Sequence, residues 1–156
     1  MNEEGKVVLL IGGHQRSGTT MLCHLCNSHP DITVTREFGN FVPIGKPFSA
    51  YTKKILGQWW GRNKFRYWVR LSPPPAKRWK RWTRTLNGHV FTAQYLFALS
   101  RVHNGTIDVR TIKTALQGLF PSARIVGDKW PDYVFMLDAF VSLPEAMCVM
   151  IYRDCR

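Results

Sequence analysis

The sequence predicts an α/β fold, in which a parallel β-sheet is flanked by helices. Short runs rich in Val, Ile and Leu alternate along the chain with segments of helical periodicity. Such apolar runs are typical of strands that are buried on both faces, as in parallel sheets. A second observation is the order of the first elements, which run strand, glycine-containing loop, helix and strand and so form a βαβ unit.

The first βαβ unit occupies residues 7–35. Its first strand is expected at residues 7–11, and its helix at residues 19–28. The helix ends before Pro30, because the residue before a proline disfavours the α region, and a second strand follows at residues 32–35. Three residues of the helix are spaced to face the sheet together: Leu22, Leu25 and Cys26.

A basic insertion is expected at about residues 38–107. This stretch contains no Asp or Glu and holds thirteen of the 22 Lys and Arg residues, so the net charge of +12 is concentrated there. Its many Trp, Lys, Arg and Pro residues indicate loops and helices, with one amphipathic helix at residues 91–102. The charge implies an anionic partner: a nucleotide, an acidic substrate, nucleic acid or a membrane surface.

The α/β pattern resumes after the insertion. A helix capped by Asp108 is expected to run to about residue 120, and residues 123–126 are a short strand candidate. Residues 131–140 begin with proline and are expected to form a helix. The apolar run at residues 146–152 predicts a buried strand.

Residues 13–20, with the sequence GHQRSGTT, carry the strongest functional signal. Gly13 and Gly18 have the spacing of a phosphate-binding P-loop, and the segment lies between a strand and a helix. Glycines let backbone N–H groups point inward, and the helix N-terminus adds partial positive charge. Three hydroxyl donors complete the loop: Ser17, Thr19 and Thr20. An ordinary glycine turn is the alternative, but the combination favours a P-loop NTPase-like sheet.

The loop departs from that of nucleotide triphosphatases at one position. Thr19 stands where those enzymes have a lysine, and the cation is instead Arg16, inside the loop. Without the lysine, chemistry at β- and γ-phosphates loses its main support. The last strand is followed by Arg153-Asp154, with arginine where a Mg²⁺-binding carboxylate would be needed, so no metal is expected. A P-loop kinase-like phosphotransferase is therefore a disfavoured alternative.

Two segments resemble a known family. GGHQRSGTTMLCHLCNSHPDI, at residues 12–32, resembles the 5′-phosphosulfate loop and first helix of the sulfotransferase superfamily, especially protein-tyrosine sulfotransferases and bacterial relatives. Residues 149–156, an apolar run ending R-D-x-R, resemble the family's 3′-phosphate strand. The resemblance implies sulfuryl transfer from 3′-phosphoadenosine 5′-phosphosulfate (PAPS) to a hydroxyl or amine acceptor. It also implies the residues that bind the donor: Arg16, Ser17, Gly18, Thr19, Thr20 and Arg153.

Two further residues are candidates for the chemistry at the acceptor. Glu37 follows the second strand, where a carboxylate beside the phosphate loop can take a proton. In the tyrosine sulfotransferases that the chain resembles, a glutamate in this place is the base. Lys129 lies in a G-D-K-W-P segment that partly resembles the family's N-K-D-P turn, whose lysine steadies the transition state. The resemblance thus assigns Glu37, Arg16 and Lys129 to catalysis. The alternatives are a surface glutamate paired with Arg36 and an exposed lysine in a turn.

Two other patterns favour different functions. The basic–aromatic run at residues 77–84 would suit stacking on nucleic-acid bases or contact with a membrane surface, so a basic binding module is the rival class. A solvated helix face is the simpler interpretation; nucleic acid is disfavoured, and peripheral membrane contact stays open. Cys23 and Cys26 match C-x-x-C, but without a second such pair they are interpreted as buried helix cysteines rather than a metal or redox site.

The two ends of the chain add further expectations. The N-terminus is polar and acidic, unlike a signal peptide, and the four cysteines then indicate reduced thiols in the cytoplasm. The sheet is expected to be incomplete at its C-terminus, because the chain stops soon after an apolar strand that needs cover on both faces. Residues 1–156 are therefore interpreted as part of a single sulfotransferase-type domain. This chain alone is expected to be truncated and inactive, and the acceptor of the whole enzyme is expected to be anionic.

Overall fold

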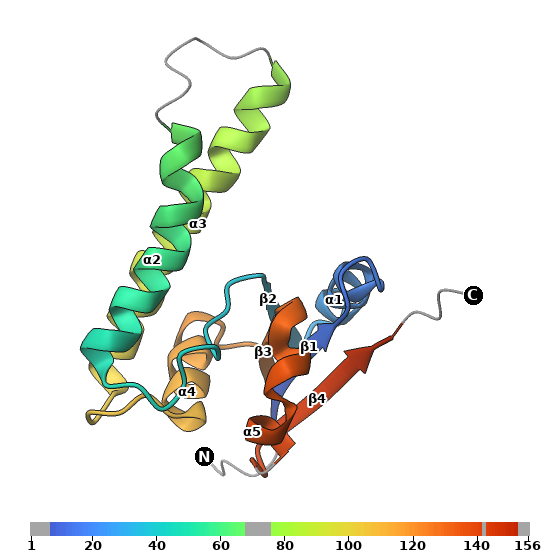
Figure 1. Cartoon of the computed structure of the whole chain (residues 1–156), viewed down its shortest axis with the longest axis vertical. Helices are drawn as coiled ribbons and strands as arrows, with labels where there is room; N and C mark the ends of the chain where they lie inside the picture. The colour runs from blue at the N-terminus through green and yellow to red at the C-terminus, as the bar shows by residue number, and fades with distance from the viewer. Residues whose placement is uncertain (1–6, 68–75, 142, 153–156) are drawn as a thin grey trace.

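A sheet of four parallel strands lies at the centre of the chain, in the order β2-β3-β1-β4. The computed structural model describes residues 7–67, 76–141 and 143–152, with side chains placed for residues 7–58, 89–140 and 143–152. Helices flank the sheet, which confirms the predicted α/β fold class (Figure 1). The strands are β1 Val7–Gly13, β2 Ile32–Arg36, β3 Ile125–Lys129 and β4 Ala146–Ile151.

The carboxyl ends of the strands meet along one edge of the sheet, which we call the carboxyl edge. Ile11 of β1 is in register with Lys129 of β3, and Lys129 is in register with Arg36 of β2. The loops that follow β1 and β2 therefore begin beside the end of β3. In open parallel sheets, ligands bind at this edge because the connecting loops converge there.

One face of the sheet is covered by helix α1, Thr19–Asn27. The predicted helix is confirmed, but its predicted inward face is wrong at Leu25, whose side chain is 58% exposed. Cys23 is buried instead, against β1 and β2. The cause is Asn27, whose side chain donates to the Val34 carbonyl at 2.9 Å and accepts from the Val34 N–H at 2.7 Å. This pair of hydrogen bonds to β2 sets the rotation of the helix about its axis, so that Cys23, one turn before Asn27, faces the sheet.

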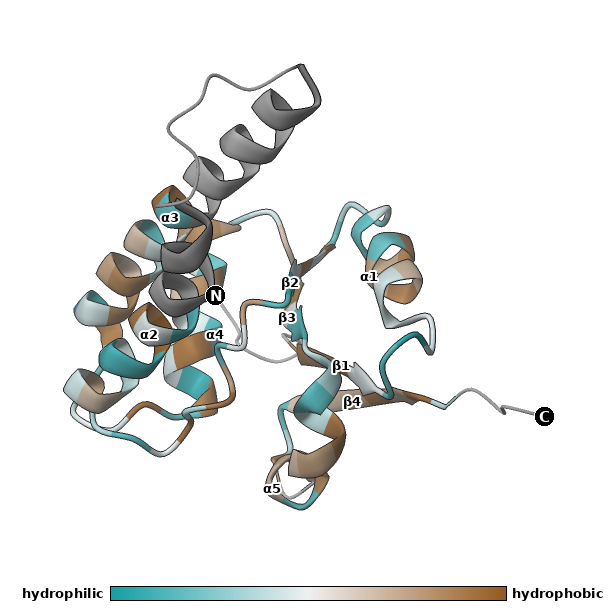
Figure 2. Ribbon diagram, turned by 45° about the horizontal axis from the view of Figure 1, so that its top comes forward, coloured by the Kyte–Doolittle hydropathy of each residue, from teal (hydrophilic) through white to brown (hydrophobic). Residues whose placement is uncertain are grey.

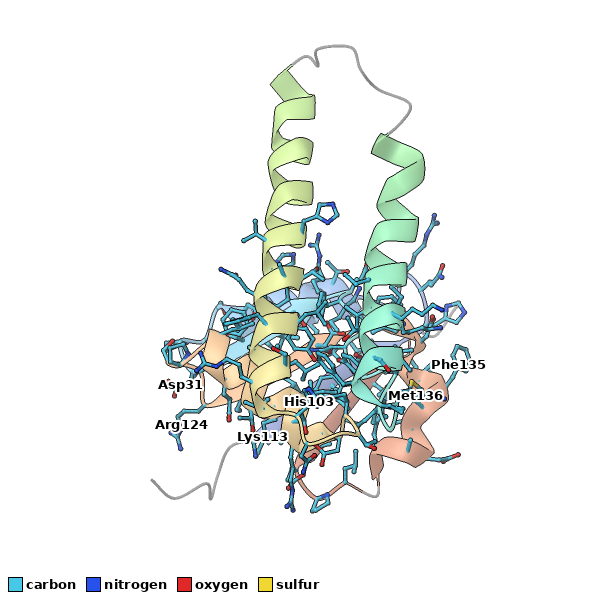
Figure 3. The ribbon with its side chains drawn as sticks, turned by 90° about the vertical axis from the view of Figure 1, so that its left-hand side faces the viewer. Asp31, His103, Lys113, Arg124, Phe135 and Met136 are labelled. Carbon is cyan, nitrogen blue, oxygen red and sulfur yellow. The ribbon has the colours of Figure 1, made fainter. Side chains whose placement is uncertain are left out.

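The opposite face carries the larger core. Val8 and Leu10 of β1 are fully buried there, whereas the alternate residues of β1 face α1. The elements on this side are α2 Phe48–Tyr67, α3 Ala76–Val102, α4 Val109–Leu119, the 3₁₀ helix η1 Pro131–Met136, and α5 Leu137–Val141. The hydrophobic residues of α3, α4 and α5 are visible as brown segments in Figure 2. In Figure 3, side chains are crowded around the ends of α2 and α3 that lie near the sheet.

The basic insertion consists mainly of two long helices, α2 and α3, of 20 and 27 residues, which project from the rest of the chain (Figure 1). The predicted helix at residues 91–102 is the second half of α3. Among the residues whose side chains the structure describes, α2 and α3 contribute apolar residues to the core close to the sheet. In the sequence, the rest of both helices shows weak apolar periodicity. The basic–aromatic run at residues 77–84 lies on α3, but its side chains are outside the described ones. No helix in the described ranges is long and apolar enough to cross a membrane.

The elements after α3 follow the prediction with two shifts. Asp108 caps α4 as predicted, accepting a hydrogen bond from the Thr111 N–H at 2.7 Å. β3 starts later than the predicted strand at residues 123–126 and extends to Lys129, because its backbone pairs with both β1 and β2 up to that residue. The predicted helix at residues 131–140 begins as the 3₁₀ helix η1 and becomes α-helical only in α5.

Candidate active site

The segment at residues 13–20 joins β1 to α1 and contains three residues whose φ angles favour glycine. Gly13 and Gly18 have φ angles of 147° and 103°, and Arg16 has a φ of 65°. A Cβ on Gly13 would meet the backbone carbonyl of Ile151 in the adjacent strand. The glycines predicted from spacing are thus required by the loop's own geometry, and we call this segment the phosphate loop.

The phosphate loop presents unsatisfied donors. α1 begins after Gly18 with no side-chain cap and no acidic residue in its first turn, so the helix N-terminus is open to an anion. The Ser17 Oγ is buried and, within the described part of the chain, has no hydrogen-bond partner. A buried hydroxyl without a partner favours a bound oxyanion. The residues of this loop therefore fit a phosphate or phosphosulfate group.

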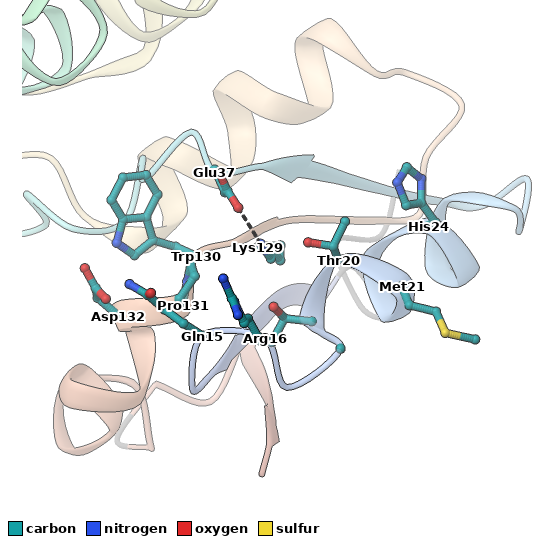
Figure 4. A pocket seen from close by; sticks show the side chains of 12 residues that line it. Gln15, Arg16, Thr20, Met21, His24, Glu37, Lys129, Trp130, Pro131 and Asp132 are labelled. Carbon is teal, nitrogen blue, oxygen red and sulfur yellow. Dashed lines mark hydrogen bonds and ion pairs between the residues drawn. The ribbon is translucent and has the colours of Figure 1, made fainter. Parts of the chain in front are cut away.

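A cavity of about 840 Å³ opens above the phosphate loop at the carboxyl edge. The loop and the first turns of α1 form one wall, and the segments that follow β2 and β3 form the other (Figure 4). Six of the residues predicted from sequence to act in binding or catalysis line this single cavity: Arg16, Gly18, Thr19, Thr20, Glu37 and Lys129. Ser17 lies within the loop, and Arg153 lies outside the described residues.

Glu37 and Lys129 form an ion pair within the cavity. The Lys129 Nζ donates to the Glu37 Oε1 at 2.7 Å, and the dashed line in Figure 4 marks this contact. Only 2% of the Lys129 side chain is exposed, whereas 49% of the Glu37 side chain is exposed. The alternative of an exposed lysine in a turn is therefore wrong. A buried ammonium needs a partner of opposite charge, and Glu37 supplies it while still reaching the cavity.

The position of Glu37 is unusual in its backbone. Its φ is 57°, in the left-handed region, and its N–H donates to the Lys129 carbonyl at 2.7 Å. A left-handed conformation is uncommon for a residue with a side chain and marks a site where the surroundings over-determine the backbone. Both the side chain and the main chain of Glu37 are thus held to the end of β3.

Asp128 is a buried polar residue that the sequence reasoning did not select as a site residue. It is fully buried beside Lys129 and accepts hydrogen bonds from four donors. Burial raises the pKa of its carboxyl group, and those hydrogen bonds oppose the rise. The available sequence signal was an acid directly before the candidate Lys129 and close to the end of a predicted strand. An Asp is seldom fully buried without a structural or chemical reason. The donors are the Thr35 and Tyr133 hydroxyls and the Phe38 and Gly39 N–H groups.

The two ends of the cavity differ in character. At one end lie Trp130, which is almost fully buried, and the exposed Asp132. At the other end lie Met21 and His24, and the guanidinium of Arg36 is 3.3 Å from the His24 Nε2. Figure 4 shows Arg16, Glu37 and Lys129 between these ends. The described residues contain no group of three or more His, Cys, Asp or Glu side chains placed to hold a metal ion.

The parallel sheet and the glycine loop at its carboxyl edge define an α/β protein of the P-loop-like class, with a site for an oxyanion beside an acid–lysine pair. The chain matches the sulfotransferase family over residues 9–156 and belongs to that family. Membership implies PAPS as the sulfuryl donor and an acceptor substrate. A comparison with curated proteins gave no significant match.

Proposed function

We propose that the protein transfers the sulfuryl group of PAPS to a hydroxyl or amine acceptor, with Glu37 as the base. The observation that carries the proposal is the ion pair of Glu37 and Lys129, held at 2.7 Å in the same cavity as the phosphate loop. A carboxylate beside an oxyanion site can remove a proton from an acceptor as it attacks. A buried ammonium in the same place can stabilise the charge that develops.

In the proposed reaction, the acceptor oxygen or nitrogen forms a bond to sulfur while the bond from sulfur to the 5′-phosphate oxygen breaks. The proton of the acceptor passes to the Glu37 carboxylate, and adenosine 3′,5′-bisphosphate leaves with the electron pair of the broken bond. Arg16 and Lys129 stabilise the negative charge on the transferring group. An ammonium has three N–H donors, so Lys129 can bond to Glu37 and to a sulfuryl oxygen together.

The donor is proposed to lie with its phosphosulfate on the phosphate loop. The open N-terminus of α1 and the hydroxyls of Ser17, Thr19 and Thr20 support this placement. Arg153 is proposed to bind the 3′-phosphate, on the resemblance of the sequence alone. No metal is needed in this mechanism, because the positive charges come from side chains.

The acceptor is proposed to be anionic or to lie on an anionic surface. The support is the charge of the α2–α3 insertion, which holds thirteen Lys and Arg residues and no acid between residues 38 and 107. Attraction of this kind is screened by salt. A Michaelis constant for the acceptor that does not change with ionic strength would contradict it.

A titration of the intact protein with three ligands tests the proposal against its rivals: adenosine 3′,5′-bisphosphate, ATP with Mg²⁺, and single-stranded DNA. The bisphosphate should bind most tightly and without metal, because Thr19 replaces the lysine that triphosphate chemistry requires. The Arg16→Ala variant should lose donor turnover by about 10²–10³-fold, the usual effect of removing one charge-stabilising donor.

The matched control is Arg124→Ala, which removes another exposed arginine, just before β3 and at the far end of that strand from the cavity. Its turnover should equal that of the unaltered protein. Tighter binding of ATP with Mg²⁺ would indicate a phosphotransferase instead. Preference for DNA would indicate a nucleic-acid binding module.

A further inference from the structure

We infer that Asp128 is a positioning residue for Glu37, which it holds in place by fixing the backbone of residues 38–41. The inference rests on the proposed role of Glu37 as the base. Residues 38–41, which we call the clamp loop, directly follow Glu37 and carry no regular strand or helix bonding. Four of their backbone polar groups are bonded by buried side chains from other elements, and the Gly39 and Phe41 carbonyls accept turn bonds from the Val42 and Ile44 N–H groups.

The Asp128 carboxylate bonds to the first half of the clamp loop. Its Oδ2 accepts from the Gly39 N–H at 2.8 Å, and its Oδ1 accepts from the Phe38 N–H at 3.3 Å. The Thr35 hydroxyl, at the end of β2, lies 2.6 Å from the same Oδ1. One carboxylate therefore bonds to residues on both sides of Glu37, and the chain between them has little freedom.

The second half of the clamp loop is bonded by two buried tyrosines. The Tyr133 hydroxyl donates to the Asp128 Oδ2 at 2.7 Å and accepts from the Phe41 N–H at 3.3 Å. The Tyr51 hydroxyl of α2 donates to the Asn40 carbonyl at 2.6 Å. Since its only proton is used there, Tyr51 accepts from the Tyr95 hydroxyl, 2.7 Å away on α3. All three tyrosines are fully buried, so water does not compete for these bonds.

The arrangement explains how Glu37 keeps its conformation. A left-handed φ on a residue with a side chain is strained and persists only where the surroundings impose it. Asp128 and Lys129 are neighbours on β3, so their side chains point to opposite sides of the strand. Asp128 bonds to the backbone that follows Glu37, and Lys129 bonds to its carboxylate. The end of β3 thus places the base and its charge partner together.

The test is a double-mutant cycle between Asp128→Asn and Glu37→Gln, with turnover followed as release of adenosine 3′,5′-bisphosphate from PAPS. A phenol, a monosaccharide and a hydroxylated lipid serve as trial acceptors. The side-chain amide of Asn presents an NH₂ group to the Gly39 N–H or the Phe38 N–H, so one clamp-loop bond is lost. Asp128→Asn alone should lower kcat by roughly 10–100-fold, as expected for a misplaced reacting group, while the KM for PAPS stays within about twofold.

In the Glu37→Gln background, Asp128→Asn should cause no further loss, because both changes act through the same base. Amide hydrogen exchange at residues 38–41 should accelerate in Asp128→Asn while exchange in β1 stays slow. Additive losses in the cycle, or unchanged exchange in the clamp loop, would overturn the inference. Turnover that survives Glu37→Gln overturns the proposed function itself, so the two failures are distinct.

A pair of buried tyrosines keeps the inference testable if Asp128→Asn does not fold. Tyr51→Phe leaves the Asn40 carbonyl without its donor, whereas Tyr95→Phe removes a hydroxyl of the same kind that bonds to the Tyr51 hydroxyl instead of the clamp loop. Tyr51→Phe should lower kcat by severalfold, and Tyr95→Phe should lower it less at equal melting temperature. Equal losses in the two variants would show that the tyrosines act only through core stability, which contradicts the inference.

Discussion

The carboxyl edge of the sheet and the opposite edge, where the strands begin and which we call the amino edge, each carry an ion pair of the same length. The surroundings of the two pairs are different. At the carboxyl edge, Lys129 and Glu37 are 2.7 Å apart, and the lysine side chain is 2% exposed. At the amino edge, Glu145 just before β4 lies 2.7 Å from Arg110, whose side chain is 77% exposed. Distance alone does not distinguish them. Burial decides, because an exposed pair is weakened by water and salt, whereas a buried charge needs its partner.

The surroundings of the two pairs also differ. The carboxyl edge holds a left-handed Glu37, a fully buried Asp128 and a phosphate loop with unsatisfied donors. The amino edge has no such strain within the described residues, and its ion pair joins two elements at the surface. Conformational strain and buried charge are concentrated where chemistry is proposed. Sequence changes of the same kind should therefore have very different effects at the two edges.

The largest difference should appear in turnover when either glutamate is replaced. Glu37→Gln should slow sulfuryl transfer by roughly 10²–10⁴-fold, the usual size of general-base catalysis. Binding of adenosine 3′,5′-bisphosphate should be nearly unchanged, because the phosphate loop is intact. The matched control, Glu145→Gln, should keep full turnover. Steady-state kinetics and calorimetric titration measure both quantities, and retained turnover in Glu37→Gln would assign that glutamate to structure.

A smaller difference is expected in stability when the cation of each pair is removed. Lys129→Met fills most of the buried volume but removes the charge that pairs with Glu37. The free energy of unfolding should fall by about 1–3 kcal/mol, as when one partner of a buried hydrogen-bonded pair is lost. Urea unfolding monitored by circular dichroism measures it. An unchanged midpoint would mean that the pair at the carboxyl edge contributes no more than a surface pair.

The smallest effect should come from the amino edge. Arg110→Ala breaks an exposed ion pair and should change the free energy of unfolding by about 0.5 kcal/mol or less. Raising the salt concentration should reduce even this difference, because exposed charges are screened. A loss above about 1 kcal/mol, beyond the usual range for surface pairs, would remove the contrast between the two edges.

Prediction from sequence succeeded best where a residue's role depends on its neighbours along the chain. The first βαβ unit, the cap of α4 by Asp108 and the glycines of the phosphate loop follow from local spacing and backbone preference, and the structure contains all of them. The insertion was harder to predict. Most of α2 and the first half of α3 lack the apolar periodicity by which a helix is recognised in a sequence.

The α/β class and the phosphate loop could be predicted from the sequence, because each depends on residues close together in the chain. The family could be predicted from two motifs, at residues 12–32 and 149–156. The rest of the site depends on tertiary contacts. Glu37 and Lys129 are 92 positions apart, and their contact depends on β2 and β3 being neighbours in register. The burial of Asp128 depends on four donors, three from residues 35–39 and one from Tyr133, and no local pattern specifies that they meet. Contacts of this kind are set by strand order and helix packing, and those are properties of the whole fold.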